Sequence, residues 1–277
     1  MRTSFFILLL LLLWLLAGCN FERNNPPTAE QTVQAMREYV IAAGIFSDSF
    51  EESDNAARDA DNQLGSLKQF KTGFPVITIE PFDQHTWPKT ITVDWGSENY
   101  LCQDNRYRRG KIIIMASDYY RNENSVLTIN FDNFYQNNHK VEGNETVTNT
   151  GRNTDGFIVH TVVVSNGKIT TPENKYIYFT QNSERTWIEG ESTITEPCDD
   201  VYLIAGCQTG ISSDSIHYEI NVEESLNALV CCKWFRSGLL HVTIEDLPLI
   251  EIDYGETDCN NQAVVSFNGV DYPIEMQ

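Results

Sequence analysis

The stretch that decides the fold is FIVHTVVVSNGKIT, residues 157–170. Most of its first eight residues are β-branched or aromatic, which favours a strand. The pair Asn166-Gly167 follows, and both residues tolerate the positive φ that a tight type I′ turn requires. We therefore predict a β-hairpin with Asn166-Gly167 as its turn.

The same pattern continues in both directions along the chain. Eight other segments are β-branched or aromatic and alternate or run apolar, namely residues 78–80, 90–95, 111–115, 125–131, 176–179, 216–222, 239–244 and 264–267. Asn268-Gly269 predicts another tight hairpin, and residues 136–138 predict a third turn. No long helical pattern separates these segments, so parallel crossovers are not expected. The predicted fold is mainly β, with a single large curved antiparallel meander sheet of about a dozen strands, either rolled or open as a half-barrel.

A short helical segment is predicted before the sheet. Thr28 and Gln31 have the spacing of a capping box, in which each side chain accepts a hydrogen bond from the other residue's backbone N–H. An apolar stripe at helical spacing follows, made of Val33, Met36, Val40 and Ala43. Residues 49–64 form a second, weaker helical stretch, because three aspartates dilute its apolar face.

Glycines recur at a nearly constant interval. Gly143, Gly190 and Gly238 each precede a strand-like run and lie 47 and 48 residues apart. Asp-Trp-Gly at residues 94–96 is echoed by Asp-Tyr-Gly at residues 253–255. These echoes predict a recurring hairpin unit in one sheet, with glycine at a bulge or bend.

The N-terminus carries an export signal. Arg2 precedes 13 apolar residues, 5–17, which are too few to span a bilayer but fit the hydrophobic region of a signal peptide. The run ends in Leu-Ala-Gly-Cys at residues 16–19, which resembles the bacterial lipobox. The resemblance implies that residues 1–18 are removed and that Cys19 is acylated. Two or three acyl chains anchor a protein stably.

Composition and charge limit the partners. The chain has 39 acidic and 19 basic residues, a formal charge of −20, which argues against nucleic acid as a ligand. We expect one partner to be the membrane, reached through the lipid anchor, and a further partner to be a glycan or an envelope protein. The predicted organisation is a signal peptide (1–18), a lipidated tether (19–27), an N-terminal helical segment (28–70) and an antiparallel β domain (71–277). The outer membrane is the favoured location, on its periplasmic or its cell-surface face.

Several motifs resemble a family of uncharacterised lipoproteins from gut Bacteroidota. Besides the lipobox they are WPKTITVDWG at 87–96, RRGKI at 108–112, FDNFY at 131–135, KVEG at 140–143, RTWIEG at 185–190, DYG at 253–255 and NG at 268–269. The resemblance covers nearly the whole mature chain and implies an all-β envelope lipoprotein, but it assigns no activity, cofactor or catalytic residue. Bacteroidota also attach O-glycans at Asp-Ser/Thr-apolar sites, which would make Ser215 a modification site.

Six cysteines remain beside Cys19, an even number that favours disulfides in an exported protein. We predict a bond between Cys232 and Cys259, because strands 233–244 and 248–254 joined at Glu245-Asp246 would place the two residues opposite each other. A register shift of one residue would bring in Cys231 instead. Residues 198–207 look like one strand, whose ends lie too far apart for a bond between its own cysteines.

Catalytic signatures are missing from the sequence. None of the five histidines has metal-ligand spacing, and the chain has neither a nucleophile elbow nor a phosphate-binding glycine loop. We therefore expect no enzyme activity, no metal and no cofactor. Six aromatic residues could stack on sugar rings, although packing of the sheet explains them more simply; they are Trp87, Trp95, Tyr119, Tyr120, Trp187 and Trp234.

The expected function is that of a non-enzymatic cell-envelope lipoprotein, a structural or binding module. Two alternatives stay open. One is a glycan-binding accessory lipoprotein or glycosidase of a carbohydrate-uptake system. The other is a lipid-carrier-like half-barrel, which rests on fold analogy alone. The concave face of the sheet distinguishes these alternatives: an apolar cavity suits lipid, an aromatic row suits glycan, and an acid pair in a cleft suits hydrolysis.

Overall fold

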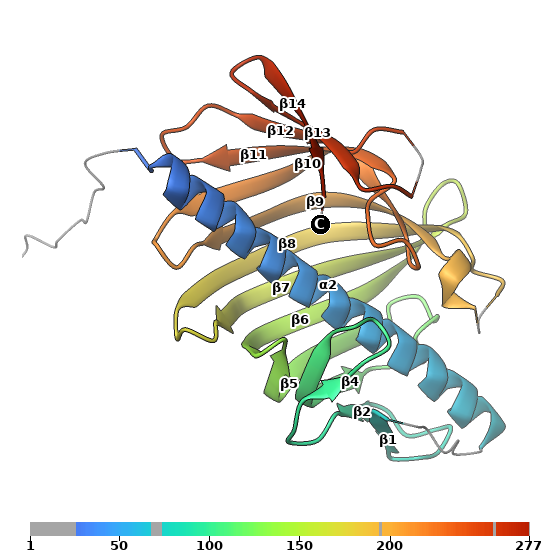
Figure 1. Cartoon of the computed structure of the whole chain (residues 1–277). Coiled ribbons are helices and arrows are strands. Elements are labelled where there is room, and N and C mark those ends of the chain that lie inside the picture. The colour runs from blue at the N-terminus through green and yellow to red at the C-terminus, as the bar shows by residue number, and fades with distance from the viewer. Residues whose placement is uncertain (1–25, 68–73, 194–195, 257–258, 277) are drawn as a thin grey trace, which may run out of the picture.

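The computed structural model describes residues 26–67, 74–193, 196–256 and 259–276. In this part of the chain one long helix, α2 (Ala29–Ser66), crosses one face of a single large sheet (Figure 1). A single-turn 3-10 helix, η2, covers Pro197–Asp199. The strands are β1 (Val76–Glu80), β2 (Lys89–Asp94), β3 (Tyr100–Leu101), β4 (Tyr107–Ala116), β5 (Val126–Gln136), β6 (His139–Arg152), β7 (Ile158–Thr170), β8 (Tyr176–Glu189), β9 (Val201–Ile211), β10 (His217–Leu229), β11 (Ser237–Ile244), β12 (Ile250–Asp253), β13 (Gln262–Phe267) and β14 (Val270–Glu275).

The fourteen described strands form an antiparallel meander. Each strand pairs with its neighbours in sequence from β1 to β14, except that β2 pairs directly with β4 and the short β3 pairs with the other end of β4. The sheet is not closed, so β1 and β14 are its edges. The predicted mainly-β meander is therefore confirmed. We call the face that carries α2 the inner face and the opposite face the outer face.

The helix starts as predicted and lies within the predicted segment 28–70, but the two predicted helical stretches form one continuous helix. Thr28 is the N-cap, and its side chain and that of Gln31 form the capping box. The helix then continues for 38 residues without a break. The aspartates that weaken the sequence signal in residues 49–64 do not interrupt it, because Asp54 and Asp61 bond to other parts of the protein from inside the interface.

The predicted apolar stripe of the helix is only half correct. Val33 is 50% exposed and Val40 is 65% exposed, whereas Met36 and Ala43 pack against the two core clusters. The fully buried side of the helix is rich in small residues; it includes Ala35, Ala42, Phe46, Ser49, Phe50, Ser53, Ala57, Ala60 and Leu64. Small side chains let a helix approach a sheet closely, and a search for large apolar residues overlooks such a face.

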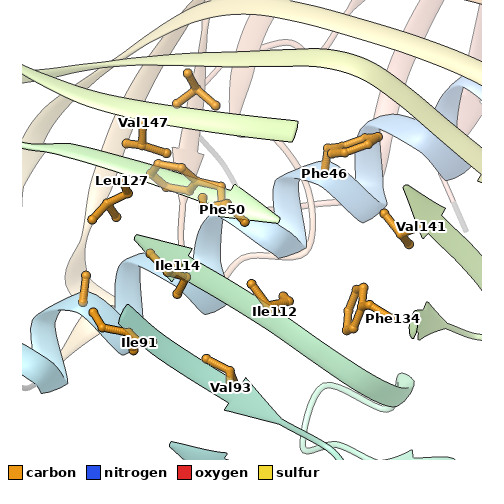
Figure 2. Packing of buried hydrophobic residues seen from close by; sticks show 14 of the residues in the cluster. Phe46, Phe50, Ile91, Val93, Ile112, Ile114, Leu127, Phe134, Val141 and Val147 are labelled. Carbon is orange, nitrogen blue, oxygen red and sulfur yellow. The ribbon is translucent and has the colours of Figure 1, made fainter. Parts of the chain in front are cut away.

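The largest core cluster lies between the middle of α2 and strands β1–β8. Phe46 and Phe50 reach from the helix toward isoleucine, leucine and valine side chains of the inner face (Figure 2). The ring of Phe46 stacks on Phe179 of β8 with 5.4 Å between ring centroids. A second cluster joins the first turns of α2 to β9–β12. The helix therefore packs against the sheet along most of its length.

The predicted hairpin at Asn166-Gly167 is also wrong, because β7 runs straight through both residues. Asn166 has a φ of 53° and forms a bulge, where the pairing with β8 shifts between Val164 and Gly167. A Cβ atom on Gly167 would lie 2.5 Å from the carbonyl oxygen of Phe179 and 3.0 Å from the ring of Phe46. The glycine therefore makes room for α2 rather than for a turn.

The other two predicted turns are confirmed. Gln136 pairs with His139 around a two-residue turn, and Phe267 pairs with Val270 around Asn268-Gly269. All four turn residues have positive φ, between 48° and 72°. Tight hairpins of this kind join β5 to β6 and β13 to β14.

The glycine echoes also have structural counterparts. Gly143 and Gly238 have φ of 123° and 122°, and each lies at a shift in strand register. In the other echo, Asp94 accepts a hydrogen bond from the N–H of Gly96 at 2.7 Å, and Asp253 accepts one from the N–H of Gly255 at 2.8 Å. Glycine thus supplies bulges and strand-end turns at the predicted places.

Candidate functional site

The sequence-predicted modification sites lie apart from each other. Cys19 falls outside the described residues. Ser215 lies in the turn between β9 and β10, where its side chain is exposed and its φ is 61°. The Ser215 N–H donates to the carbonyl of Ser212. The turn therefore presents the Ser215 hydroxyl on the surface.

Two cysteine pairs lie at disulfide distance, and one of them is the predicted pair. Cys232 and Cys259 have Cα atoms 5.8 Å apart, and Cys198 and Cys231 have Cα atoms 4.8 Å apart. Both disulfides connect loops at one end of strands β8–β13. Cys231 and Cys232 are adjacent in the loop before β11, and their partners lie in the β8–β9 and β12–β13 loops. Within the described residues Cys102 and Cys207 are free.

The strand register that predicted this bond is off by one residue. In the structure Leu239 pairs with Asp253 and His241 with Glu251, whereas the prediction would pair Leu239 with Ile252. Strand β11 also begins only at Ser237, so neither Cys231 nor Cys232 lies in a strand. The disulfide lies beyond the strand ends, where the loop conformations accommodate the one-residue difference in register. Similarly, Cys198 lies in η2 rather than in the same strand as Cys207.

The inner face carries an unusual number of charged groups against α2, which we call the charged layer. Its centre is Arg58 of α2, which is 5% exposed. The Arg58 guanidinium contacts Asp54 at 2.8 Å, Asp200 at 2.7 Å and the hydroxyl of Tyr202 at 2.9 Å. Trp187 donates its indole N–H to Asp200 at 3.0 Å. The two terminal nitrogens of Arg58 are thus held by its own helix, by Asp200 just before β9 and by Tyr202 of β9, while its Nε has no partner among the described residues.

A second part of the charged layer lies near β4 and β5. Arg106 contacts Asp48 of α2 at 3.1 Å, and Arg108 contacts Glu52 at 3.4 Å. The Gln136 amide also donates to Asp48. Burial raises the pKa of both helix carboxyls, and the two arginines oppose that shift.

A third polar contact holds the first half of α2. Glu38 is 2% exposed and accepts hydrogen bonds at 2.6 Å from both the N–H and the hydroxyl of Ser213. Ser213 lies in the turn between β9 and β10. The helix is therefore held to the rest of the protein at several places along its length, among them Glu38, Asp48 with Glu52, and Asp54 with Arg58.

The centre of the charged layer also contains a stacked pair of rings. Tyr120 donates its hydroxyl to Asp54, and its ring stacks on His160 of β7 with 5.1 Å between centroids. Its backbone N–H donates to Asp61 at 2.9 Å. Burial lowers the pKa of His160 to about 4 and raises that of Asp61 to about 7. The imidazole is therefore neutral at neutral pH.

Glu145 of β6 is a buried carboxyl of the inner face. It is 1% exposed, and by strict geometry neither of its carboxyl oxygens has a hydrogen-bond partner among the described residues. Burial raises its pKa to about 7, although the nearby Ser49 hydroxyl and, less strongly, the charge of Arg185 oppose the shift. The two ring nitrogens of His160 likewise have no partner in the described part of the chain. The strand pattern contains both residues, but it does not show that α2 covers them.

The six aromatic residues singled out from the sequence do not form one exposed row. Trp95, Trp187 and Tyr120 are at most 2% exposed and pack the core. Trp87 packs edge-on against Tyr119. Trp234 lies in the loop between β10 and β11. Packing therefore explains most of these residues.

A different set of aromatic residues lies on the outer face. Cross-strand pairing places Arg109, Tyr135, Lys140, Thr170 and Tyr176 in one line across β4–β8. Tyr176 and the adjacent Tyr178 are 48% and 46% exposed. Arg109 lies over the ring of Tyr135 at 3.7 Å, and Lys168 lies over Tyr176 at 4.4 Å. We call the set Arg109, Tyr135, Lys140, Lys168, Tyr176 and Tyr178 the outer tyrosine row.

Sequence reasoning missed the outer tyrosine row, although a signal was present. Tyr176 and Tyr178 alternate with Ile177 and Phe179, so the two tyrosines share one face of β8 and the two apolar residues share the other. Which face is buried depends on α2, whose contact with Phe179 is a tertiary feature.

Comparison with known proteins found no matching family, no similar curated protein and no similar solved structure. Among the residues that the structure describes, no helix has the length and apolar character needed to cross a membrane.

Proposed function

We propose that this chain is a non-enzymatic, lipid-anchored module of the bacterial cell envelope, held at the outer membrane by acyl groups on Cys19. The observation that carries this proposal is the order of a short apolar run, the Leu-Ala-Gly-Cys sequence at 16–19 and a polar tether. α2 begins at Ala29, so the folded body starts ten residues after the acylated cysteine. The anchor and the body are therefore close neighbours.

The position of α2 supports a structural or binding role over an enzymatic one. The helix covers the inner face, where the charged layer lies, and its central groups Asp54, Arg58 and Glu145 are between 1% and 6% exposed. A substrate would have to displace α2 to reach them. A lipid-carrier-like role ranks lower for the same reason, because α2 fills the side of the sheet where a carrier would hold its lipid.

The anchor is tested with Cys19→Ala in the full-length chain expressed in a bacterium with a lipoprotein-processing pathway. We expect the variant to leave the membrane fraction and to lose labelling by an alkyne fatty acid. Cys102→Ala, which removes a free cysteine outside the lipobox, should leave both properties unchanged. If the Cys19 variant stays in the membrane pellet with an unchanged mature mass, the proposal is wrong.

A second candidate function is glycan binding, and the outer tyrosine row favours it. Exposed tyrosine rings offer flat apolar surfaces with polar edges, and Arg109, Lys140 and Lys168 supply hydrogen-bond donors beside them. Lys140 and Lys168 already contact Glu142 at 3.0 and 3.7 Å. The same contacts also serve as ordinary cross-strand pairs that stabilise the sheet. We therefore expect weak glycan binding or none.

A glycan array probed with the chain distinguishes these two functions. Binding with a dissociation constant near 1 μM, or about −8 kcal/mol, would overturn the leading proposal in favour of a glycan-binding protein. In that case Tyr176→Ala and Tyr178→Ala should weaken binding. Tyr107→Ala, which removes an exposed tyrosine outside the outer tyrosine row, is the matched control and should not.

A further inference from the structure

The last three strands extend the sheet beyond the helix. Ile250 and Ile252 of β12 still pack at the margin of the cluster that contains Ala35 of α2. Cross-strand pairing places Phe267 and Val270 in line with Ile250, and Val265 and Tyr272 in line with Ile252. The side chains of β13 and β14 in these two lines therefore lie on the inner face, past the edge of α2.

This part of the inner face is apolar and open. We call it the C-terminal apolar face; its members are Ile250, Ile252, Ala263, Val265, Phe267, Val270, Tyr272 and Ile274. Val270, Tyr272 and Ile274 are 50%, 51% and 40% exposed. The outer face of the same strands carries mainly polar residues, among them Glu251, Ser266, Asp271 and Glu275. Such a one-sided apolar surface marks an interaction site.

The edge of the sheet disfavours a further strand as the partner. Phe267 and Val270 close the two-residue turn between β13 and β14. Residues 270, 272 and 274 then direct their N–H groups toward β13, and residues 271, 273 and 275 direct theirs outward. Residue 273 is proline, which has no N–H, and proline at an edge blocks strand addition. The partner must therefore contact the face rather than the edge.

The C-terminal apolar face lies at the end of the molecule where the chain would leave for the membrane. Glu38, ten residues into α2, bonds to the turn between β9 and β10. The β11–β12 and β13–β14 turns lie at this same end of the meander, near the start of the helix (Figure 1). Nine residues separate Cys19 from Ala29, so at about 3.5 Å per residue the start of α2 stays within about 35 Å of the anchor.

We propose that the C-terminal apolar face rests on the lipid bilayer, with Tyr272 and its aliphatic neighbours at headgroup level. This inference rests on the proposed acylation of Cys19. Tyrosine suits this depth, because its ring is apolar and its hydroxyl stays hydrated. Acidic residues of the outer side and a net charge of −20 oppose contact with anionic lipid. The lipid is therefore zwitterionic, as in phosphatidylethanolamine.

The contact is tested with the acylated full chain in phosphatidylethanolamine–phosphatidylcholine vesicles that contain brominated acyl chains, which quench nearby tryptophan. The variant is Tyr272→Trp. Tyr176→Trp is the matched control, because Tyr176 is 48% exposed but lies on the outer face. We expect tryptophan at 272 to show a blue shift and a loss of fluorescence beyond that of the unmodified chain. Tryptophan at 176 should show neither.

The outcomes separate the inference from the proposed function. If the acylated chain stays on the vesicles and tryptophan at 272 is quenched no more than at 176, the inference is wrong and the anchor stands. A blue shift without quenching, together with a doubled mass in solution, would assign the face to a second copy and also overturn the inference. If Cys19 carries no acyl group, both fail.

Discussion

At the scale of single residues, Glu145 and His160 respond to pH in opposite directions. Both lie in the interior and have no hydrogen-bond partner among the described residues. Burial disfavours the charged form of each, so the pKa of Glu145 rises to about 7 and that of His160 falls to about 4. The folded protein therefore keeps Glu145 neutral between pH 4.5 and about pH 7, where the unfolded chain would ionise it. It likewise keeps His160 neutral between about pH 4 and pH 6.5.

Glu145→Gln should make the protein more stable relative to the parent as pH rises. The unfolded Glu145 loses its proton near pH 4.5 and the folded one near pH 7, so the parent loses stability as pH rises through this window. The difference approaches about 3 kcal/mol above pH 7. Urea unfolding at pH 4.5 and pH 8 measures it. Glu184→Gln, on the exposed side of β8, is the control and should show little change with pH.

His160→Phe should make the protein more stable relative to the parent as pH falls. The phenylalanine ring should keep the stack on Tyr120. The unfolded His160 gains a proton near pH 6.5 and the folded one only near pH 4, so the parent loses stability as pH falls through this window. The variant should lack this loss. Thermal unfolding at pH 4 and pH 7 compares the two. An equal loss in both proteins would show that His160 is not the group that titrates.

At the scale of elements, the packing of α2 against the sheet depends on the ion pairs of Arg58. Arg58→Met should destabilise the fold by about 3–5 kcal/mol, because it leaves Asp54 and Asp200 buried without their cation. Urea unfolding measures the loss, and hydrogen exchange should show faster opening of α2. Arg152→Met removes an ion pair with Glu191 whose arginine is 52% exposed, and should cost less than about 1 kcal/mol. Equal effects of the two variants would contradict a special role for Arg58.

The helix shows where sequence reasoning succeeds and where it fails. Its start follows from Thr28 and Gln31, because capping depends on residues three apart. Its buried side does not follow, because Val33 and Val40 are more apolar than many of the residues that the sheet covers, such as Ser49 and Ser53. The acids of the second half look unfavourable until their partners on and near β4 and β5 are known.

At the scale of the whole molecule, a meander is predictable because its contacts are local. Turn residues such as Asn268-Gly269 join strands that pair directly. The charged layer is not predictable in the same way. It joins Asp54 and Arg58 to Asp200 and Tyr202, more than 140 residues further on, and no local pattern records such pairs.

The disulfide between Cys232 and Cys259 should contribute to the stability of the last third of the sheet. Cys232→Ser should lower the free energy of unfolding by about 3–4 kcal/mol, because it frees a closed loop of 28 residues in the unfolded chain. Cys102→Ser, at a free cysteine, should change it little. Peptide mapping without reductant checks the pairing itself. Cys259 found as a free thiol or bonded to Cys198 would contradict it.

The long separation between Arg58 and Asp200 has a consequence for the order of folding. Neighbouring strands of a meander meet early, because only short loops must close, whereas the contact between Arg58 and Asp200 must wait for a loop of 142 residues. The helix also packs against β1 and β2, which follow it closely in the sequence, so its first contacts do not depend on that loop. We therefore expect the ion pair between Arg58 and Asp200 to form late, with the guanidinium in water until β9 has joined the sheet.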